Sequence, residues 1–290
     1  MRRINVIGLT AVAVLLTVGR GMGQRKVSLA DNAALRYWAA FSQLQDAAIT
    51  DQEAQELNSV LDKMGPFDIS RFSDLIQKNT PALEIMARGT LLPECDWGLD
   101  YGLGENVPVD YATKALALGR LNILFAMHLY HSGNGDGAIG AIAAGLRFSH
   151  DLASGGSLFA TLAAKDLLVT HLTAAGDAVH MGQLSAAQRS RLQKAVAALG
   201  DGFDWPAAAK RDLDALAPRY SGDSRASLAL SRVVSSYTAF LKGESDLPGL
   251  MDAINHAPPE LAQSIPSPKR VEEQKQELSN KIQQTRMLLQ

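Results

Sequence analysis

Helical periodicity with clear start and stop signals runs along nearly the whole chain, and it constrains the fold more than any other feature. Apolar residues recur at intervals of three and four, as in Ile139, Ile142 and Leu146, which places them on one face of a helix. Helix starts carry capping residues: Ser185, followed by Gln188, matches the capping box. No stretch alternates apolar and polar residues convincingly, as a half-buried strand does. The sequence therefore predicts an all-α protein.

The turns between the expected helices are short, which predicts antiparallel helical hairpins. Helices are expected over 32–44, 50–64, 110–131, 157–181, 205–217, 223–242, 247–256 and 268–290, with others beginning at Asp68, Thr80, Asp136 and Ser185. In the first of them, Leu35, Trp38 and Phe41 share a face. We expect one helical-hairpin domain over 24–256, a Pro-rich linker over 257–267, and a polar C-terminal helix over 268–290.

The beginning of the chain has the layout of a signal peptide, over residues 1–23. Arg2 and Arg3 precede an apolar run, and small residues at Gly21 and Gly23 suit signal peptidase. Cleavage is expected after Gly23, with Gly21 as the alternative. A retained anchor is the other interpretation, but the run is shorter than the roughly 20 apolar residues of a membrane span. The prediction is a protein exported to the periplasm or outside the cell, touching the membrane only through this segment before cleavage.

The net charge argues against one class of partner, nucleic acid, and the cysteine content limits the possible disulfides. Residues 1–23 hold three arginines and no acid, so the remainder has 25 basic and 30 acidic residues and a net charge of −5. With no basic stripe, nucleic acid is not an expected partner. Cys95 is the one cysteine, so it is either buried or linked to another chain. No later stretch is expected to span a membrane.

One unit of the chain, residues 117–152, resembles a tetratricopeptide-type hairpin. Gly119 and Leu121 lie on its first helix, Gly133 is in the turn, and Ala138 opens a second helix rich in small residues. The resemblance covers this unit and a degenerate neighbour at 158–199. It implies an array of antiparallel hairpins and, by analogy, a protein-binding or scaffolding role. The general layout is also similar to that of exported bacterial helical proteins, a likeness that implies no activity.

An irregular stretch, residues 92–108, interrupts the helices and holds the candidate catalytic residues. Long loops carry function more often than short ones. Acids and aromatic residues alternate in this loop: Glu94, Asp96, Trp97, Asp100 and Tyr101. Glycan hydrolysis uses a pair of carboxylates, often beside an aromatic platform. The three acids are therefore candidate catalytic residues, and the two aromatic residues are candidate ligand-binding residues.

The same loop has two other interpretations. In the favoured one, Asp96 and Asp100 cap turns while Trp97 fills the core beside Cys95. In the other, the four loop acids, which are the three candidate catalytic acids and Glu105, hold Ca²⁺ through oxygen ligands, although their spacing is not that of an EF-hand.

Histidine offers the only other candidate chemistry. His128 and His131 share one face of a predicted helix, and His150, His171 and His180 lie on neighbouring helices, so a bundle could gather them around a metal. No His-Glu-x-x-His motif accompanies them. Hydrogen-bonded core or turn histidines are the favoured interpretation, and no cofactor or metal is expected.

These observations favour a non-enzymatic scaffold or protein-interaction protein of the cell envelope, with another protein as its partner. The alternative is an envelope glycan hydrolase acting through loop 92–108. The helix over 268–290 carries a thin apolar stripe of Val271, Leu278, Ile282 and Leu289. That stripe either covers the end of the array or pairs with another copy of the chain.

Overall fold

The computed structural model describes residues 28–45, 69–107, 110–181 and 184–290, and within these ranges the chain is helical without a β-strand. The all-α prediction is confirmed. In the same ranges one isolated bridge pairs Asn32 with Glu94. The expected signal peptide, the helix over 50–64 and the cap at Asp68 lie outside the described residues.

The helices follow one another with short connections, and most lie within a few residues of their predicted bounds. They are α1 (Ala33–Ser42), α3 (Ser73–Gly89), α4 (Asp110–His131), α5 (Gly135–Ala153), α6 (Leu158–His180), α7 (Ala186–Ala197), α8 (Trp205–Asp214), α9 (Ala217–Tyr220), α10 (Ser224–Leu241), α11 (Leu247–Asn255), α12 (Pro259–Ser264) and α13 (Pro268–Leu289). Two 3₁₀-helices, Ile69–Phe72 and Tyr101–Asn106, complete the described elements.

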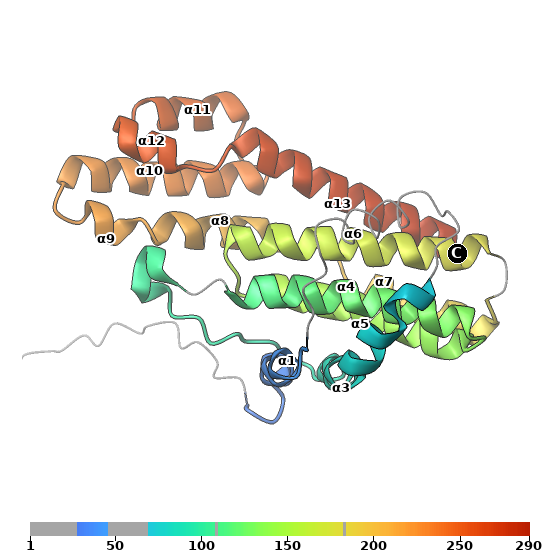
Figure 1. Ribbon diagram of the computed structural model, residues 1–290. Coiled ribbons are helices and arrows are strands. Elements are labelled where there is room, and N and C mark those ends of the chain that lie inside the picture. The colour runs from blue at the N-terminus through green and yellow to red at the C-terminus, as the bar shows by residue number, and fades with distance from the viewer. Residues whose placement is uncertain (1–27, 46–68, 108–109, 182–183) are drawn as a thin grey trace, which may run out of the picture.

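Three long helices, α4, α5 and α6, form the centre of the molecule and contact one another (Figure 1). Local signals set their ends: Gly133, at φ +80°, turns the chain after α4, and Asn134 and Ser157 accept backbone hydrogen bonds at the starts of α5 and α6. Helices α1 and α3 cover one side of this centre, while α13 lies along α6 and α7. A short turn joins α4 to α5, and these two helices pack against each other as a hairpin.

Glycines allow the three central helices to approach closely. A Cβ on Gly119 of α4 would lie 2.7 Å from the Leu167 side chain, and one on Gly145 of α5 would lie 2.0 Å from the ring of His171. His171 is fully buried and fills the space that Gly145 leaves. The helix rich in small residues thus packs tightly at Gly145.

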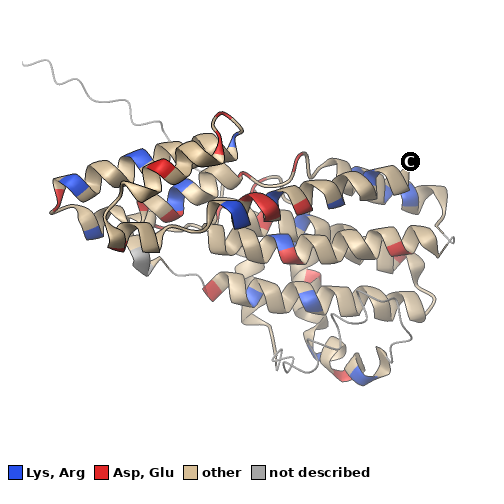
Figure 2. Ribbon diagram, turned by 90° about the horizontal axis from the view of Figure 1, so that it is seen from above, with Lys and Arg blue, Asp and Glu red and all other residues tan. Residues whose placement is uncertain are grey.

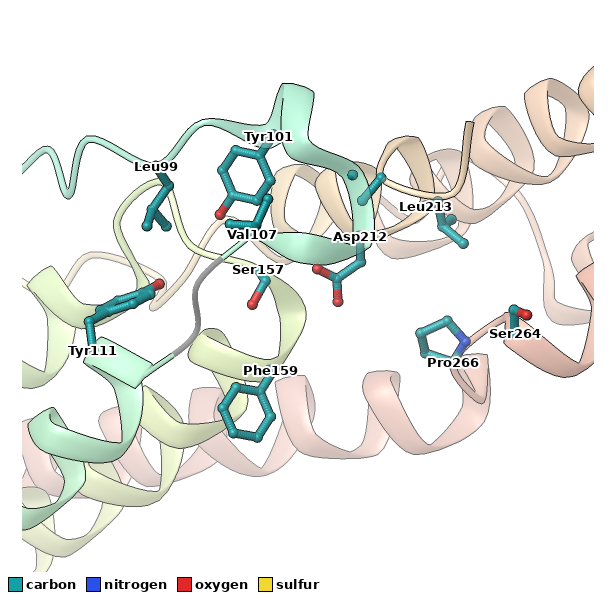
Figure 3. A pocket seen from close by; sticks show the side chains of 12 residues that line it. Leu99, Tyr101, Val107, Tyr111, Ser157, Phe159, Asp212, Leu213, Ser264 and Pro266 are labelled. Atoms are coloured by element: carbon teal, nitrogen blue, oxygen red, sulfur yellow. The ribbon is translucent and has the colours of Figure 1, made fainter. Parts of the chain in front are cut away.

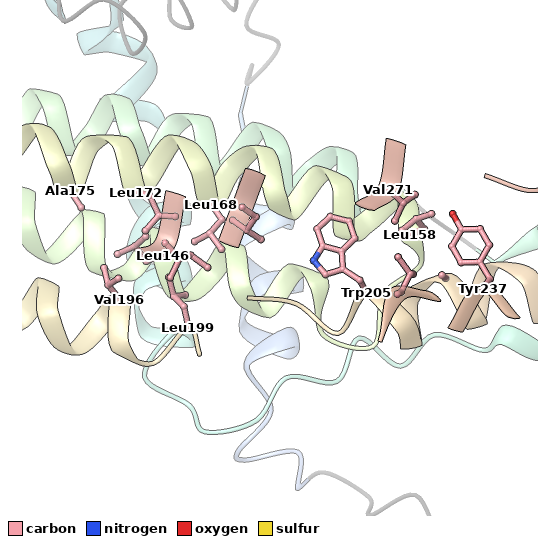
Figure 4. Packing of buried hydrophobic residues seen from close by; sticks show 14 of the residues in the cluster. Leu146, Leu158, Leu168, Leu172, Ala175, Val196, Leu199, Trp205, Tyr237 and Val271 are labelled. Atoms are coloured by element: carbon pink, nitrogen blue, oxygen red, sulfur yellow. The ribbon is translucent and has the colours of Figure 1, made fainter. Parts of the chain in front are cut away.

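Two apolar clusters make up the core. One joins α1, α3, α4, the end of α5 and the first half of α6 around aromatic side chains that include Tyr37, Trp97 and Phe148. The other joins α6, α7, α8, α10 and α13, where Leu168, Trp205 and Tyr237 are buried (Figure 4). The central helices contribute to both clusters, which makes one continuous bundle. Lysines, arginines and acids are interspersed along the helices, as seen in Figure 2.

The C-terminal helix uses its apolar stripe within the chain. Its four stripe residues are each at most 3% exposed, and α13 packs on α6 and α7. The Lys165 ammonium, in a side chain only 7% exposed, lies 2.7 Å from a carboxylate oxygen of Glu277. Gln193 Nε2 donates to the carbonyl of Leu289 over 2.7 Å. Pairing with another copy through 268–290 stays a prediction, and it would have to use exposed residues such as Met287.

The prediction that a separate helix begins at Thr80 is wrong. Helix α3 continues through this position, with Pro81 in its interior. An interior proline removes a hydrogen bond and costs about 3 kcal/mol or more. Ile76 before the proline and Leu83 and Met86 after it are all buried. Burial on both sides of the proline offsets its cost and keeps α3 in one piece.

Of the three residues predicted to share a face of α1, Phe41 is buried together with Tyr37, whereas Leu35 and Trp38 are 43% and 39% exposed. A three-residue spacing defines a face of a helix without saying that this face turns inward. The predicted linker 257–267 contains the short helix α12, whose Leu261 is fully buried. Proline at the first turn suits this helix, since no backbone N–H is needed there.

Helix α6 is long and apolar enough to cross a membrane by length and composition alone, contrary to the sequence expectation. In the fold it is a core helix, packed against α4, α5 and α13. Its buried Lys165 is paired with α13, an arrangement that belongs to a helix inside a bundle.

Replacing Gly145 by Ala should destabilise the protein by roughly 1–3 kcal/mol, the usual effect of overpacking. The new methyl group would meet the His171 ring, which is enclosed by α4 and α5. Chemical denaturation measures the change. The matched control is Gly140→Ala in the same helix, where the nearest atom is the end of Arg191 at 3.5 Å. The free energy of unfolding of this control should rise by up to about 1 kcal/mol, because Ala has a higher helix propensity than Gly. Equal changes in the free energy of unfolding at the two positions would contradict the packing described.

Candidate functional site

The backbone of Asp151, near the end of α5, holds the irregular loop against the core. Its carbonyl oxygen accepts a hydrogen bond from Trp97 Nε1 over 2.9 Å and lies 3.6 Å from Cys95 Sγ. Ser154 Oγ donates to the carbonyl of Cys95 over 3.0 Å. On the other side of the loop, Asn32 bonds to both the N–H and the carbonyl of Asp96. These contacts fix the conformation of residues 94–97.

The carboxylate of Asp151 is itself buried and joins three parts of the chain. The Tyr37 hydroxyl donates to Oδ2 over 2.6 Å, and Arg147 Nε lies 2.8 Å from Oδ1. Arg147 also donates to the carbonyls of Leu92 and Pro93. Burial raises the pKa of Asp151, while Tyr37 and Arg147 act in the opposite direction. Burial and the adjacent carboxylate raise the pKa of Tyr37, which stays a proton donor.

Trp97 fills the core, as the favoured interpretation of the loop predicted. It is 5% exposed, and its ring packs against those of Tyr37, Phe41 and Tyr111 with centroids 4.8–6.0 Å apart. Such a ring offers no open platform to a sugar. Burial raises the pKa of the Cys95 thiol, and the nearby Asp151 adds to the effect, so this thiol is a poor nucleophile.

Each of the three candidate acids is tied to nearby backbone by hydrogen bonds. Asp96 and Asp100 are exposed, and each accepts from a backbone N–H two residues on, at Gly98 and Gly102, over 2.9 Å. The backbone of Glu94 bonds to that of Asp31 and Ala33, just before and at the start of α1. None of the three acids lines either of the two pockets described below. Asp96 and Asp100 therefore act as turn caps.

The histidines are dispersed. His131 is exposed and contacts the Met127 carbonyl, and His128 is half-buried. Within the described ranges no group of three or more His, Cys, Asp or Glu side chains is placed to hold a metal ion. His171 lies 2.8 Å from the Leu167 carbonyl through Nδ1 and 3.1 Å from Asn122 Nδ2 through Nε2. Burial lowers its pKa to about 4, so it is a neutral core histidine.

A pocket of about 270 Å³ opens where residues 99–107, the start of α6, α8 and residues 264–266 meet (Figure 3). We call it the Asp212 pocket. Its walls are mostly apolar, and its polar side chains are Tyr101, Tyr111, Ser157, Asp212 and Ser264. Tyr101, a sequence-predicted ligand-binding residue, lines this pocket and donates its hydroxyl to the Gly155 carbonyl over 2.8 Å.

Two groups of the Asp212 pocket stand out: the Asp212 carboxyl has a raised pKa, and the buried Tyr111 hydroxyl lacks a hydrogen-bond partner in the described part of the chain. The carboxylate of Asp212 accepts from the backbone N–H of Leu158, and burial raises the pKa of Asp212 to about 6. Because this pKa exceeds that of the unfolded chain, the ionised carboxylate costs stability above about pH 6, and the cost fades as the pH falls. Tyr111 is 1% exposed, and its hydroxyl finds no hydrogen-bond partner within the described part of the chain.

A second, larger hollow of about 780 Å³ lies between α3, α4 and α5. We call it the arginine groove. Its floor is apolar and includes the small residues Gly137, Gly140 and Ala144 of α5. Among the described lining residues, Arg88, Arg147 and Arg191 supply positive charge and Glu84 is the one acid. The groove is therefore apolar along its base and positive at its edges.

Comparison with protein-family models, curated proteins and solved structures finds no match to this chain. Asp212, Tyr111 and the groove arginines were not among the sequence-predicted site residues. Each belongs to an ordinary helical pattern in the sequence, and only the fold brings them to a pocket.

Proposed function

We propose that the chain is an exported, non-enzymatic interaction protein of the cell envelope that binds an acidic, amphipathic helix of a partner protein. The observation that carries this proposal is the arginine groove, an apolar hollow with positive edges. Amphipathic helices bind proteins by laying their apolar face into such grooves.

The floor of the groove suits a helix. Gly137 and Gly140 present backbone instead of side chains, which allows another helix to approach closely, and Phe125 and Leu129 supply apolar surface beside them. Leu91 lies at the edge and is 82% exposed. An exposed leucine next to an apolar hollow gains from being covered by a partner.

The edges of the groove favour carboxylates on the partner. Arg88 and Arg191 are exposed, and each donates to a backbone carbonyl: Arg88 to that of Glu84 over 3.3 Å, and Arg191 to that of Asp136 over 3.4 Å. Both guanidinium groups therefore keep donors for a carboxylate, which arginine binds in a fork geometry. Arg147 is already held by Asp151.

The glycan hydrolase alternative has less support. Such an enzyme needs two carboxylates roughly 5–10 Å apart across an open cleft. Asp96 and Asp100 are engaged in turns outside both pockets, and Asp212 is the one acid among the described residues of its pocket. A binding role needs no such pair.

Export is supported by the signal-peptide pattern of residues 1–23. Protein recovered from outside the cytosol should begin at Gln24, the residue after the expected cleavage site. Mass spectrometry of its amino-terminal peptide measures this. An intact Met1 on that material would contradict export with cleavage.

A synthetic helical peptide with leucines on one face and glutamates on both flanks should bind the mature protein, as measured by fluorescence anisotropy. Replacing both Arg88 and Arg191 by Glu should weaken this binding at least about tenfold, since two attractive pairs become repulsive. Raising the salt concentration should also weaken binding, because exposed charges are screened.

The matched control is the double substitution of Arg225 and Arg232 by Glu. These arginines are exposed on α10, away from the groove, and their reversal changes the net charge by the same amount. The control should bind as the wild type does. Equal losses in the two double variants, or equal binding of a peptide with lysines in place of glutamates, would contradict the proposed function.

A further inference from the structure

We propose that the Asp212 pocket binds a small primary amine with an apolar body, placing its ammonium group between the Asp212 carboxylate and the Tyr111 hydroxyl. The pocket lies outside the arginine groove and shares no lining residue with it. The inference is therefore independent of the proposed function.

The Tyr111 hydroxyl is the first observation that points to a ligand. It is buried without a hydrogen-bond partner in the described ranges, a state that costs stability. Figure 3 shows the hydroxyl directed into the pocket, toward Ser157. The Trp97 ring packs against Tyr111 with centroids 4.8 Å apart, and a Cβ on Gly156 would lie 3.0 Å from the hydroxyl oxygen. A polar group in the pocket would satisfy this hydroxyl.

The Asp212 carboxylate is the second observation. It is the one acid among the described lining residues, and no Lys, Arg or His is among them. Leu158 provides one backbone N–H to it, whereas a carboxylate can accept about four hydrogen bonds. The pocket thus has a negative group with free acceptor capacity, which favours a cation.

The other titratable groups around Asp212 do not neutralise it in the pocket. Arg211, the residue before Asp212 on α8, lowers the pKa of Asp212 in part, but its guanidinium donates to the Gly156 carbonyl over 3.1 Å and lines a neighbouring hollow with Phe203 and Asp204. Tyr101, Tyr111 and Tyr237 face Asp212 from the loop, α4 and α10, and burial raises the pKa of each phenol. All three phenols are therefore uncharged near pH 7.

Size and wall chemistry define the body of the ligand. The volume of about 270 Å³ lies near the small end of ligand pockets, which span roughly 300–1,000 Å³. Leu99, Val107, Leu213 and Pro266 form apolar walls, and Phe159 is 51% exposed beside them. An aromatic or short aliphatic amine of about ten non-hydrogen atoms fits this space, whereas an anion would meet Asp212.

Helix capping explains only part of the arrangement. A carboxylate at the start of α6 is favoured by the helix dipole. Asp212 lies there, because its carboxylate accepts a hydrogen bond from the backbone N–H of Leu158, the first residue of α6. However, Ser157 already caps α6 by accepting from Ala160, and capping does not account for the Tyr111 hydroxyl. A ligand accounts for both groups.

Phenethylamine is the probe, and isothermal titration calorimetry on the mature protein near pH 7.5 is the measurement, above the pH at which Asp212 takes up its proton. We expect saturable binding at one site. Phenethyl alcohol, a neutral molecule of the same shape, should bind at least about tenfold more weakly, and the anion hydrocinnamate should not bind. Asp212→Asn should weaken amine binding at least about tenfold, and Tyr111→Phe at least about fivefold.

The matched controls are Asp214→Asn on the same helix and Tyr130→Phe on the same helix as Tyr111, neither of which lines the pocket. Both should bind the amine as the wild type does. The Asp212 and Tyr111 variants remove a buried charge and a buried unpaired hydroxyl, so thermal melting should show them at least as stable as the wild type.

Several results would overturn the proposal. They are equal affinity for the amine and the alcohol, unchanged affinity in either pocket variant, and no saturation by phenethylamine up to about 10 mM. If a variant fails to fold, the affinity ratio of amine to alcohol in the wild type decides. A failure of amine binding would leave the proposal of peptide binding at the arginine groove unaffected. A failure of peptide binding would likewise leave the amine proposal unaffected.

Discussion

The buried carboxylate of Asp151 is the interaction on which the N-terminal half of the structure depends. An isolated charge inside a protein is strongly unfavourable, and it becomes tolerable only with charged and hydrogen-bonding partners. Tyr37 on α1 and Arg147 on α5 are those partners. Since the backbone carbonyl of the same residue receives the Trp97 indole, one position fixes α1, α5 and the irregular loop relative to one another.

This arrangement gives the loop a structural reason for its irregular sequence. Trp97 enters the core, Asp96 and Asp100 close turns, and the chain then continues to Tyr101 at the edge of the Asp212 pocket. The loop thus builds one wall of a pocket whose charged group comes from α8. The arginine groove forms separately, where α3 crosses the α4–α5 hairpin. The molecule offers two distinct surfaces on one helical frame.

Features set by neighbouring residues could be predicted from the sequence. The capping box at Ser185 and the stripe of α13 are examples. Features set by distant contacts could not: Tyr37 and Asp151 are 114 residues apart, and nothing local marks Asp151 among the acids of the chain. The same holds for Asp212 and Tyr111, which share a pocket only because α8 packs beside the start of α6. Pro81 was misplaced because burial on both sides of it outweighs the local signal.

A double-mutant cycle between Tyr37→Phe and Asp151→Asn tests the central claim most directly, with the free energy of unfolding as the quantity measured. If the buried pair joins α1 to α5, the two substitutions should be coupled by about 1.5 kcal/mol or more, as expected for a buried hydrogen bond to a charged group. If the change in the free energy of unfolding of the double mutant equals the sum of the two single-mutant changes to within about 0.5 kcal/mol, the two side chains act independently. That result would contradict the account of how the loop and its pocket are held.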